Sequence, residues 1–360
     1  MRTGFADLHH AVLKTDLCSY CGACVPACPV DVLSYAKEQP VIDGSCASGC
    51  RVCFDVCPEN RAGGTLLQDY MADHRPDEER QLVGRLTDPD LLARTGSGGL
   101  TTGLALYLLE SGRVDGVVMT GFGGDSAWEP RPLIATTRSE VIAASGPKYA
   151  LSPTLSVLDR IAEEGHERVM LVGLPCHIES LRQLQAAQDR LEEGPRRAVR
   201  AITHAVGLWC GNNFRTEGTE RFISAIGVDP DRVTEVGYTR RDGRLEFSVS
   251  TPDGSTGTPF GQYLGYLLAG QTAPSCQGCR RWHAAYADVS VGGLDTPGLK
   301  WSGFMVQTRE GHDLVSGAEA AGYITVQDMS SDERAWLARK NQGSRGFGTP
   351  KPLYSKGNQR

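Results

Sequence analysis

The sequence has no long hydrophobic run. Its longest apolar stretches, such as Leu104 to Leu109, are far shorter than the ~20 residues that a membrane-spanning helix needs. Residues 1–14 also lack the apolar segment of a signal peptide. We therefore expect no transmembrane segment and a cytoplasmic location, where the surroundings keep thiols reduced.

The sequence also has no excess of positive charge. It carries 37 Lys and Arg against 43 Asp and Glu, and the net charge of −6 gives no indication of nucleic-acid binding. Twelve cysteines are many, but a disulfide scaffold is typical of short secreted chains and does not fit 360 residues. This length instead allows one small and one large domain with a sizeable core.

Eight of the twelve cysteines form two copies of one pattern within residues 14–60. The copies follow C-x2-C-x2-C-x3-C-P, with one extra residue in the first gap of the second copy. In bacterial ferredoxins three closely spaced thiolates of this run hold one [4Fe-4S] cluster, and the fourth, before a proline, binds the other cluster. A zinc ribbon would favour two CxxC pairs or mixed Cys and His ligands. We therefore assign Cys18, Cys21, Cys24 and Cys57 to one cluster, and Cys28, Cys46, Cys50 and Cys53 to the other.

Composition divides the chain into four parts. Residues 1–60 form an expected ferredoxin-like domain whose core is so small that bound metal must stabilise it. Residues 61–94 are charged and polar, and we interpret them as a linker containing an exposed helix. Residues 95–341 form a larger domain, and residues 342–360, rich in Gly, Pro, Lys and Arg, are expected to be a flexible tail.

Helical and strand patterns alternate along the large domain, which predicts a mixed α/β or α+β fold. Two alternating runs around Asp242-Gly243 predict a β-hairpin. A capping box at Ser330 to Glu333 predicts the start of a final helix. The other expected helices are 101–110, 153–164 and 178–188; the expected strands are 32–35, 41–42, 114–119, 169–172, 199–208, 233–239, 245–250, 287–291 and 304–308.

Four cysteines lie outside the ferredoxin-like repeat, and four is the number that one further cubane needs. Cys276 and Cys279 form a CxxC pair, while Cys176 and Cys210 each follow a predicted strand. Loops at strand ends are where cofactors lie in α/β sheets. Spacing alone leaves two interpretations open: a third [4Fe-4S] cluster, or two ordinary buried thiols and a redox-active CxxC pair.

Two loops have the composition of a nucleotide site. Thr95 to Thr102 is rich in glycine and directly precedes a helix, so its backbone could approach a phosphate at the helix N-terminus. A second loop, 146–152, combines a cation, an aromatic ring and a hydroxyl. Either segment alone could also be a plain solvated turn. The candidate cofactor contacts are Ser97, Gly98, Gly99, Thr101, Lys148, Tyr149 and Ser152.

The order of these segments resembles that of a known family. The matching segments are 97–99 before a helix, 146–149, 173–176, 207–210, 276–279 and 287–292. In these the chain is similar, over essentially its whole length, to the coenzyme F420 hydrogenase/dehydrogenase beta-subunit family of iron–sulfur flavoproteins. Its front module resembles the subtype found in the input subunit of the F420H2 dehydrogenase, and similar modules occur in chlorophyll-pathway reductases of the same family.

The resemblance implies a function and a set of cofactors. It implies FAD in the large domain, a third [4Fe-4S] cluster held by the four remaining cysteines, and coenzyme F420 as the hydride carrier. Electrons would pass between that carrier and one-electron acceptors through FAD and the clusters, and no general base is needed. The expected partner is ferredoxin or a larger redox complex. That complex could be a membrane complex to which this chain binds at the periphery. The alternatives are a ferredoxin-dependent reductase of an organic substrate, such as a tetrapyrrole, and a non-catalytic electron-transfer subunit.

The sequence departs from the family pattern at two places. After the CxxC the family commonly has an acidic residue, an aromatic residue and a threonine, where this chain has Arg280-Arg281-Trp282-His283. His177 follows Cys176 where a glutamine is usual. Arg281 and His283 would change the charge beside the cofactors, so the donor need not be F420; the alternative is a solvated loop.

Overall fold

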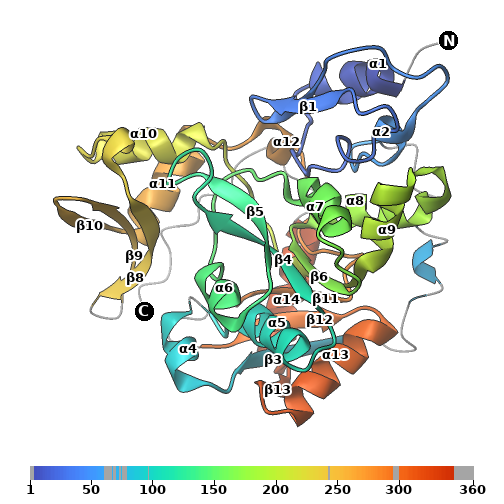
Figure 1. The fold of residues 1–360 in the computed structure, drawn as a ribbon. Coiled ribbons are helices and arrows are strands. Elements are labelled where there is room, and N and C mark those ends of the chain that lie inside the picture. The colour runs from blue at the N-terminus through green and yellow to red at the C-terminus, as the bar shows by residue number, and fades with distance from the viewer. Residues whose placement is uncertain are drawn as a thin grey trace.

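The computed structural model describes residues 4–60, 67, 70–72, 74, 79–95, 97–241, 244–294 and 300–343. The expected turn at Asp242-Gly243 and nearly all of the expected tail lie outside these residues. The described residues form a small cysteine-rich front module, a large sheet covered by helices, and a separate three-stranded sheet (Figure 1). None of the described helices is both long and apolar enough to cross a bilayer.

The front module contains little regular structure. A short helix α1 (Gly4–Leu8) continues into a π-helical turn (His9–Leu13), and a second helix, α2, spans Val52–Asp55. Strands β1 (Leu33–Ala36) and β2 (Gln39–Ile42) pair antiparallel, which confirms the two short strands expected there. The core of the module consists of Leu8, Val12, Leu13, Leu33 and the cysteines themselves.

The large sheet has eight strands in the order β13-β3-β12-β11-β7-β6-β4-β5. Four neighbours, β11, β7, β6 and β4, run parallel, and the outer pairs are antiparallel. The strands are β3 (Arg80–Leu86), β4 (Gly116–Phe122), β5 (Pro130–Ala135), β6 (Val169–Gly173), β7 (Ile202–Leu208), β11 (Val289–Gly293), β12 (Ser302–Val306) and β13 (Ile324–Asp328).

Helices cover both faces of this sheet because its central strands are apolar on both sides. In β6, Val169 and Leu171 pack into one core, and Met170 and Val172 pack into the other. One face is covered by α5 (Leu100–Glu110), α6 (Arg138–Ala143) and α13 (Arg309–Ala320); the other by α7 (Leu158–Glu163), α8 (Pro175–Ala186) and α9 (Glu193–Ala201). Two further helices lie at the margin, α4 (Pro89–Arg94) and α14 (Ser331–Gly343).

The second sheet is antiparallel and has the order β10-β9-β8. Strands β8 (Glu235–Arg241) and β9 (Arg244–Thr251) confirm the expected hairpin, and β10 (Gly254–Pro259) extends it. This sheet packs with α10 (Glu217–Ala225) and α11 (Phe260–Gly270) around an aromatic core in which Phe247 and Tyr263 stack at 4.1 Å. Shorter helical segments are α12 (Pro274–Gln277), Thr154–Val157, Gln188–Arg190 and Pro230–Arg232.

Two sequence-based boundaries are wrong. Residues 80–94 are not a linker, because β3 pairs with both β12 and β13 inside the large sheet. The strand expected at 199–208 begins only at Ile202, since residues 193–201 form α9. The helix expected at 153–164 is confirmed, with a 3-10 turn at Thr154–Val157 that continues into α7. The strand-like composition of 199–201 reflects burial of Val199 and Ala201, which a helix face provides equally well.

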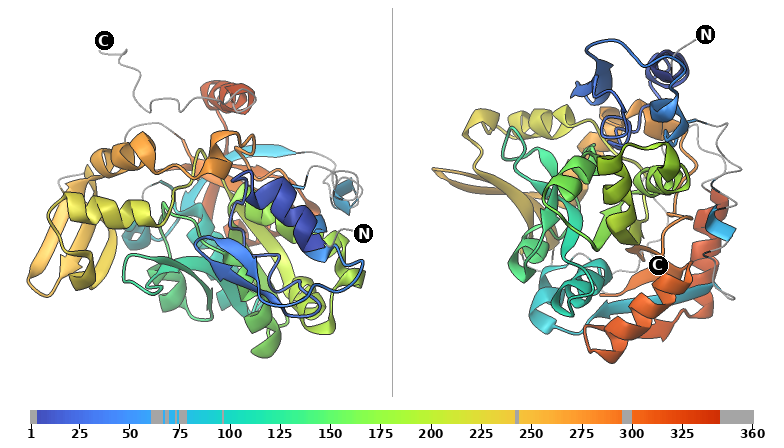
Figure 2. Two further views of the ribbon diagram at one scale, coloured as in Figure 1. Left: turned by 90° about the horizontal axis from the view of Figure 1, so that it is seen from above. Right: turned by 45° about the vertical axis from the view of Figure 1, so that its right-hand side comes forward.

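The front module and the large domain share one hydrophobic core. Ala23 and Val56 of the module lie in the same buried cluster as Leu155 and Leu181. The backbone of Cys21 also accepts a hydrogen bond from Leu155 at 2.9 Å. Residues 4–60 are therefore held against the body of the protein, and Figures 1 and 2 show them above the α7 and α8 side of the sheet.

Candidate iron–sulfur and flavin site

The cysteines of the large domain lie at one edge of the sheet, where the parallel strands end. Cys176 stands in the first turn of α8, directly after β6, and Cys210 follows the end of β7. The backbone of Cys210 donates to the carbonyl of Trp282 at 2.8 Å, and that of Ala273 donates to Asn213 at 3.0 Å. These two bonds bring both sides of the CxxC segment, 276–279, to the Cys210 loop.

Neighbouring sulfurs contribute to the raised pKa values of Cys176 and Cys210. Burial raises the pKa of Cys210, and the neighbouring Cys276 and Cys279 raise it further. Burial likewise raises the pKa of Cys176, with Cys210 as the next cause. The structure thus gathers the four cysteines that come from three separate segments of the sequence; we call them the body set.

The eight front cysteines form two sets in space. Burial is the largest cause of the raised pKa of Cys24, and the next causes are its neighbours Cys21, Cys18 and Cys57. For Cys53, burial raises the pKa to about 12, and the next causes are Cys46, Cys50 and Cys28. The fourth cysteine of each copy therefore lies near the first three of the other copy. We call Cys18, Cys21, Cys24 and Cys57 the inner set, and Cys28, Cys46, Cys50 and Cys53, which line one small pocket, the outer set.

The chemistry of these sets fits a large cationic cofactor. Buried thiols with raised pKa values stay protonated at neutral pH unless bound metal supplies positive charge, and thiolates are the form that binds iron. Among the described residues, no three His, Cys, Asp or Glu side chains are close enough to share one metal ion. The thiolates that bind one zinc ion lie about 2.3 Å from it, whereas the four thiolates of a cubane bind four different iron atoms and lie farther apart.

The inner set adjoins the body set through helix α8. Ser180 lies about one turn after Cys176, and its hydroxyl accepts from the Cys21 thiol at 3.7 Å and donates to the Val56 carbonyl at 2.8 Å. Cys21 in turn contributes to the raised pKa of Cys176. Cys53 of the outer set contributes to the raised pKa of Cys24 in the inner set, and Val30, which is 43 % exposed, lines the pocket of the outer set. The three sets are therefore arranged in the order outer, inner, body.

The glycine-rich turn lies at the same edge of the sheet, near the end of β3 and the start of β12. Gly98 accepts from the backbone of Leu86 at 2.8 Å, and its N–H donates to the Ser302 hydroxyl at 3.1 Å. Gly99 has the left-handed φ of 67°. Helix α5 begins at Leu100 without a side-chain cap, so its first N–H groups are available to an anion. Gly96 lies outside the described residues.

Gly98 is required by the protein's own packing. A Cβ atom there would lie 2.4 Å from the carbonyl oxygen of Gly84 and 2.6 Å from the backbone nitrogen of Ser302. Both are backbone atoms of sheet strands and cannot move aside cheaply. The glycine therefore does not by itself indicate a phosphate.

We expect Gly98→Ala to lower the midpoint of thermal unfolding by several degrees, because overpacking at a backbone contact costs roughly 1–3 kcal/mol. Gly265→Ala is the matched control, since that exposed glycine of α11 has open space around it. Anaerobic calorimetry of both variants tests this. Equal midpoints for Gly98→Ala and the unsubstituted protein would contradict this role of Gly98 in packing. Loss of flavin from Gly98→Ala would not show where the flavin binds, because the substitution disturbs the packing of the sheet itself.

The three candidate residues of the 146–152 loop have different surroundings. The Lys148 ammonium donates to the carbonyls of Ala144, Ser145 and Gly146 and so caps the end of α6, while its Nζ lies 5.6 Å from the centre of the Phe122 ring. Tyr149 packs against Phe214, Tyr238 and Phe260. Burial raises its pKa to about 12, with contributions from Tyr263 and Cys210. Ser152 is buried, and its hydroxyl has no partner among the described residues.

Lys148 should make stability depend on pH. Burial lowers its pKa to about 7 in the folded protein, against about 10.4 in an unfolded chain. Between these values the unfolded chain binds more protons, so the folded state gains stability as the pH rises from about 7 to about 10. Lys148→Met should flatten this rise, whereas Lys37→Met, at an exposed lysine, should not. Anaerobic unfolding midpoints across this range measure the effect; an unchanged slope in Lys148→Met would contradict it.

Comparison with known families decides the relationship. The model of the coenzyme F420 hydrogenase/dehydrogenase beta subunit matches the chain in two parts, an N-terminal part over residues 81–159 and a C-terminal part over residues 166–332. A 4Fe-4S binding domain matches residues 11–34. The beta subunit of the coenzyme F420 hydrogenase of Methanothermobacter thermautotrophicus is 31% identical over 247 residues, which cover 68% of this chain and 83% of that protein. The chain belongs to the coenzyme F420 hydrogenase/dehydrogenase beta-subunit family.

Two further comparisons, with a curated relative and with a solved structure, show lower sequence identity. The coenzyme F420-dependent sulfite reductase of Methanocaldococcus jannaschii is 27% identical over 91% of this chain, but the chain spans only half of that protein. A chain of the F420-reducing [NiFe] hydrogenase complex from Methanosarcina barkeri has the same fold, with a TM-score of 0.58 and 24% identity over 76% of this chain and 90% of that one. The family match begins in β3, which agrees with the place of that strand in the large sheet.

The two departures from the family pattern have structural explanations. His177 is buried, and its Nδ1 accepts from the backbone of Leu174 at 3.3 Å at the start of α8. Burial lowers its pKa to about 4, so it adds no charge beside Cys176. Arg281 does not lie in a solvated loop: its guanidinium is ion-paired with Glu59 and Glu179. His283 has a ring contact with Trp282 at 6.4 Å.

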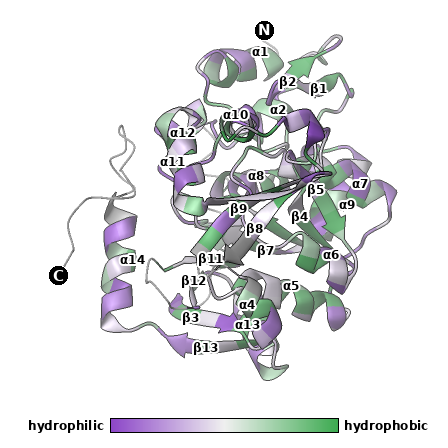
Figure 3. Cartoon of the chain, turned by 90° about the vertical axis from the view of Figure 1, so that its left-hand side faces the viewer, coloured by the Kyte–Doolittle hydropathy of each residue, from purple (hydrophilic) through white to green (hydrophobic). Residues whose placement is uncertain are grey.

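A tryptophan cluster beside the body set did not follow from the sequence motifs. Trp209 precedes Cys210, Trp282 follows the CxxC, and their ring centres are 4.7 Å apart. Trp336 of α14 lies 6.1 Å from Trp209 and 6.0 Å from Trp282. Helix α14 lies on the outside of the sheet, with polar residues before and after a short apolar run at 335–338 (Figure 3). It lies almost wholly beyond the family match. Aromatic side chains of this chain therefore cover the Cys210 side of the site.

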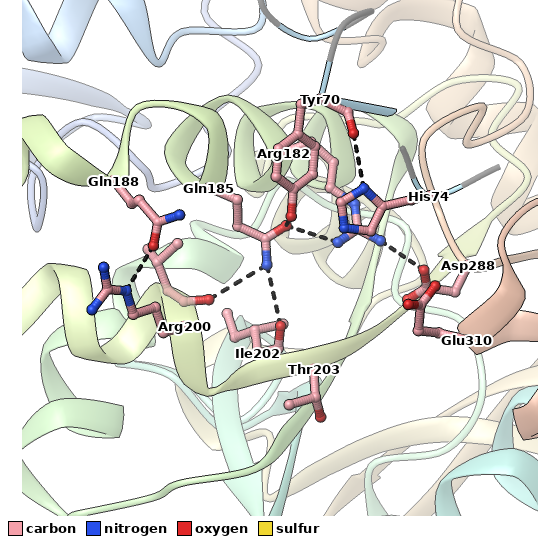
Figure 4. A pocket seen from close by; sticks show the side chains of 11 residues that line it. Tyr70, His74, Arg182, Gln185, Gln188, Arg200, Ile202, Thr203, Asp288 and Glu310 are labelled. Carbon is pink, nitrogen blue, oxygen red and sulfur yellow. Dashed lines mark hydrogen bonds and ion pairs between the residues drawn. The ribbon is translucent and has the colours of Figure 1, made fainter. Parts of the chain in front are cut away.

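A polar pocket lies at the opposite edge of the sheet, where β7 begins (Figure 4). Its volume is about 240 Å³, and a buried ion pair between Arg182 and Asp288, at 2.8 Å, forms part of its wall. The Gln185 side chain accepts a hydrogen bond from Arg182 and donates one to the carbonyl of Ile202. Gln185 follows Cys176 by nine residues of α8, or ~14 Å along the helix. The pocket is thus separate from the cysteine site.

Proposed function

We propose that this family member with a 4Fe-4S domain moves electrons between coenzyme F420 and a one-electron carrier through FAD and three [4Fe-4S] clusters. The observation that supports this most is the arrangement of twelve cysteines as three adjoining sets of four. The names of relatives agree with this proposal, since they include coenzyme F420 hydrogenase subunits and an F420-dependent sulfite reductase.

The cysteine sets would hold the clusters in series. The outer set lies under an exposed surface of the front module, so a partner could approach it closely. The inner set adjoins the body set across Ser180. The body set is half-buried at the sheet edge, and the tryptophan cluster lies beside it. The chain would therefore direct one-electron transfer along a single path.

The residues present also fit a flavin. Besides Ser152, the side chains of Trp128 and Thr272 have buried polar atoms without a partner in the described part of the chain. Ser152, Thr272 and Trp128 all lie near Phe214. Leu151, the residue before Ser152, donates its backbone N–H to the Phe214 carbonyl, and Thr272 forms a β-bridge with Phe214. Trp128 lies in the same hydrophobic core as Phe214. This group borders Tyr149 and the body set. A polar ring cofactor would satisfy these atoms.

FAD would supply the exchange between hydride transfer and single-electron transfer, which is the chemistry of the cofactor. The uncapped N-terminus of α5, with Ser97 and Thr101 beside it, would hold the phosphates. Tyr149, Ser152 and Trp128 would position the ring near the body set. Lys148 would act indirectly, because its ammonium already bonds three carbonyls at the end of α6.

A comparison of electron donors tests the proposed function. Anaerobically purified protein should contain one FAD, and reduced coenzyme F420 should bleach it faster than NADH or reduced ferredoxin does. Faster bleaching by ferredoxin, with no reaction of F420, would support the opposite flow toward an organic substrate. Protein that contains clusters but no flavin would identify an electron-transfer subunit without its own hydride chemistry.

A further inference from the structure

Arg281 lies at the junction between the front module and the large domain. Its Nη1 donates to Oε1 of Glu59 at 2.9 Å, its Nη2 bonds the carbonyl of Pro58, and its Nε bonds Oε2 of Glu179. Its backbone N–H donates to the Cys279 sulfur at 3.4 Å. All three nitrogens of the guanidinium are therefore engaged.

These partners belong to the loops that carry ligands of two different sets. Pro58 and Glu59 directly follow Cys57, the cysteine that crosses over to complete the inner set. Glu179 follows Cys176 by three residues on α8, and Cys279 is itself in the body set. A single side chain thus connects the segments of Cys57, Cys176 and Cys279.

Burial makes this contact stronger than an ordinary surface ion pair. The side chains of Arg281, Glu59 and Glu179 are 23 %, 14 % and 18 % exposed. Exposed pairs contribute little, whereas removing one partner of a buried pair leaves an uncompensated charge. A planar guanidinium can bind several acceptors in fixed directions, which an ammonium cannot.

We propose that Arg281 is a positioning residue that fixes the inner cluster relative to the body cluster and supplies positive charge between them. This inference rests on the proposed function, because it needs both clusters. Other contacts hold the module in place without Arg281: the shared core, the Ser180 bonds and the packing of Gly22 against Pro153. Loss of Arg281 should therefore alter the junction and not detach the module.

The test compares Arg281→Gln with Arg280→Gln, which removes the same charge from the exposed neighbouring side chain. Both variants should retain the full iron content. In Arg281→Gln alone, the reduction potential of the inner or body cluster should become more negative, and the magnetic interaction between the two reduced clusters should weaken in electron paramagnetic resonance spectra. Ferredoxin reduction should slow about tenfold while flavin reduction by reduced F420 is unchanged, a change equivalent to ~1.4 kcal/mol in the barrier.

Arg281→Lys separates charge from position. It should restore the potential, because the charge is kept, but not the magnetic interaction or the ferredoxin rate. If Arg281→Gln loses iron, the same comparison is made with Arg281→Lys and Glu59→Gln. Unchanged potentials, magnetic interaction and rates in the substituted proteins would overturn the inference. Absence of clusters or flavin in the unsubstituted protein would instead overturn the proposed function.

Discussion

Replacing Cys57 by serine is expected to remove about four of about twelve iron atoms per chain, with the same number of acid-labile sulfides, since each cubane contains four of each. Cys57 lies with Cys18, Cys21 and Cys24, although it comes from the second copy of the motif. Cys28→Ser should remove the same amount from the outer set, and Cys176→Ser from the body set. Anaerobic iron and sulfide analysis measures these losses.

The variants should differ in which cluster they lose. Cys57→Ser should abolish the magnetic interaction of the inner cluster with the body cluster, and Cys28→Ser should leave it in place. Ser180→Ala is the matched control, because Ser180 contacts the Cys21 sulfur without being a ligand and should retain all the iron. About eight iron atoms in the unsubstituted protein, unaffected by Cys176→Ser, would remove the body cluster from the account.

Loss of the outer cluster is expected to separate the two halves of the reaction. In Cys46→Ser, reduced F420 should still reduce the flavin at the normal rate, because the flavin and the body set are untouched. Reduction of ferredoxin should fall to the background rate, since the remaining clusters lie deeper in the protein. Anaerobic stopped-flow measurement with F420 and ferredoxin follows both steps in one sample.

A point substitution is the better test than removal of residues 1–60. Ala23 and Val56 lie in the core of the large domain, so deleting the front module would expose that core and disturb the body set as well. Small dyes are unsuitable acceptors because they can react with the flavin directly. Normal ferredoxin reduction by Cys46→Ser would mean that the outer cluster is structural and that electrons leave by another path.

The local cysteine patterns contain part of the information about the candidate site. The spacing in 18–28 and 46–57 predicts two sets with exchanged fourth members, and in the structure Cys57 neighbours Cys24 while Cys28 neighbours Cys53. Cys176 and Cys210 follow strands that end at the same edge of the sheet. Their approach to Cys276 and Cys279 depends on backbone bonds between distant segments, such as Cys210 to Trp282, and no local spacing encodes these.

Other features depend on tertiary context that the sequence pattern does not contain. Residues 80–86 have polar neighbours, and only pairing with β12 and β13 shows that they form an inner strand. Gly98 is typical of a phosphate loop, but its close contacts are with Gly84 and Ser302. Arg281 sits in a polar run that is compatible with a solvated loop, and its buried partners come from residues 59 and 179.

The most direct test of the central claim is one anaerobic, freeze-quenched reaction of the oxidised protein with reduced coenzyme F420. Flavin absorbance and the paramagnetic resonance of the clusters are followed over time. The account predicts that the flavin is reduced first and that the signals of reduced [4Fe-4S] clusters then appear. Clusters that stay oxidised after the flavin is reduced, yet are reduced by dithionite, would contradict it.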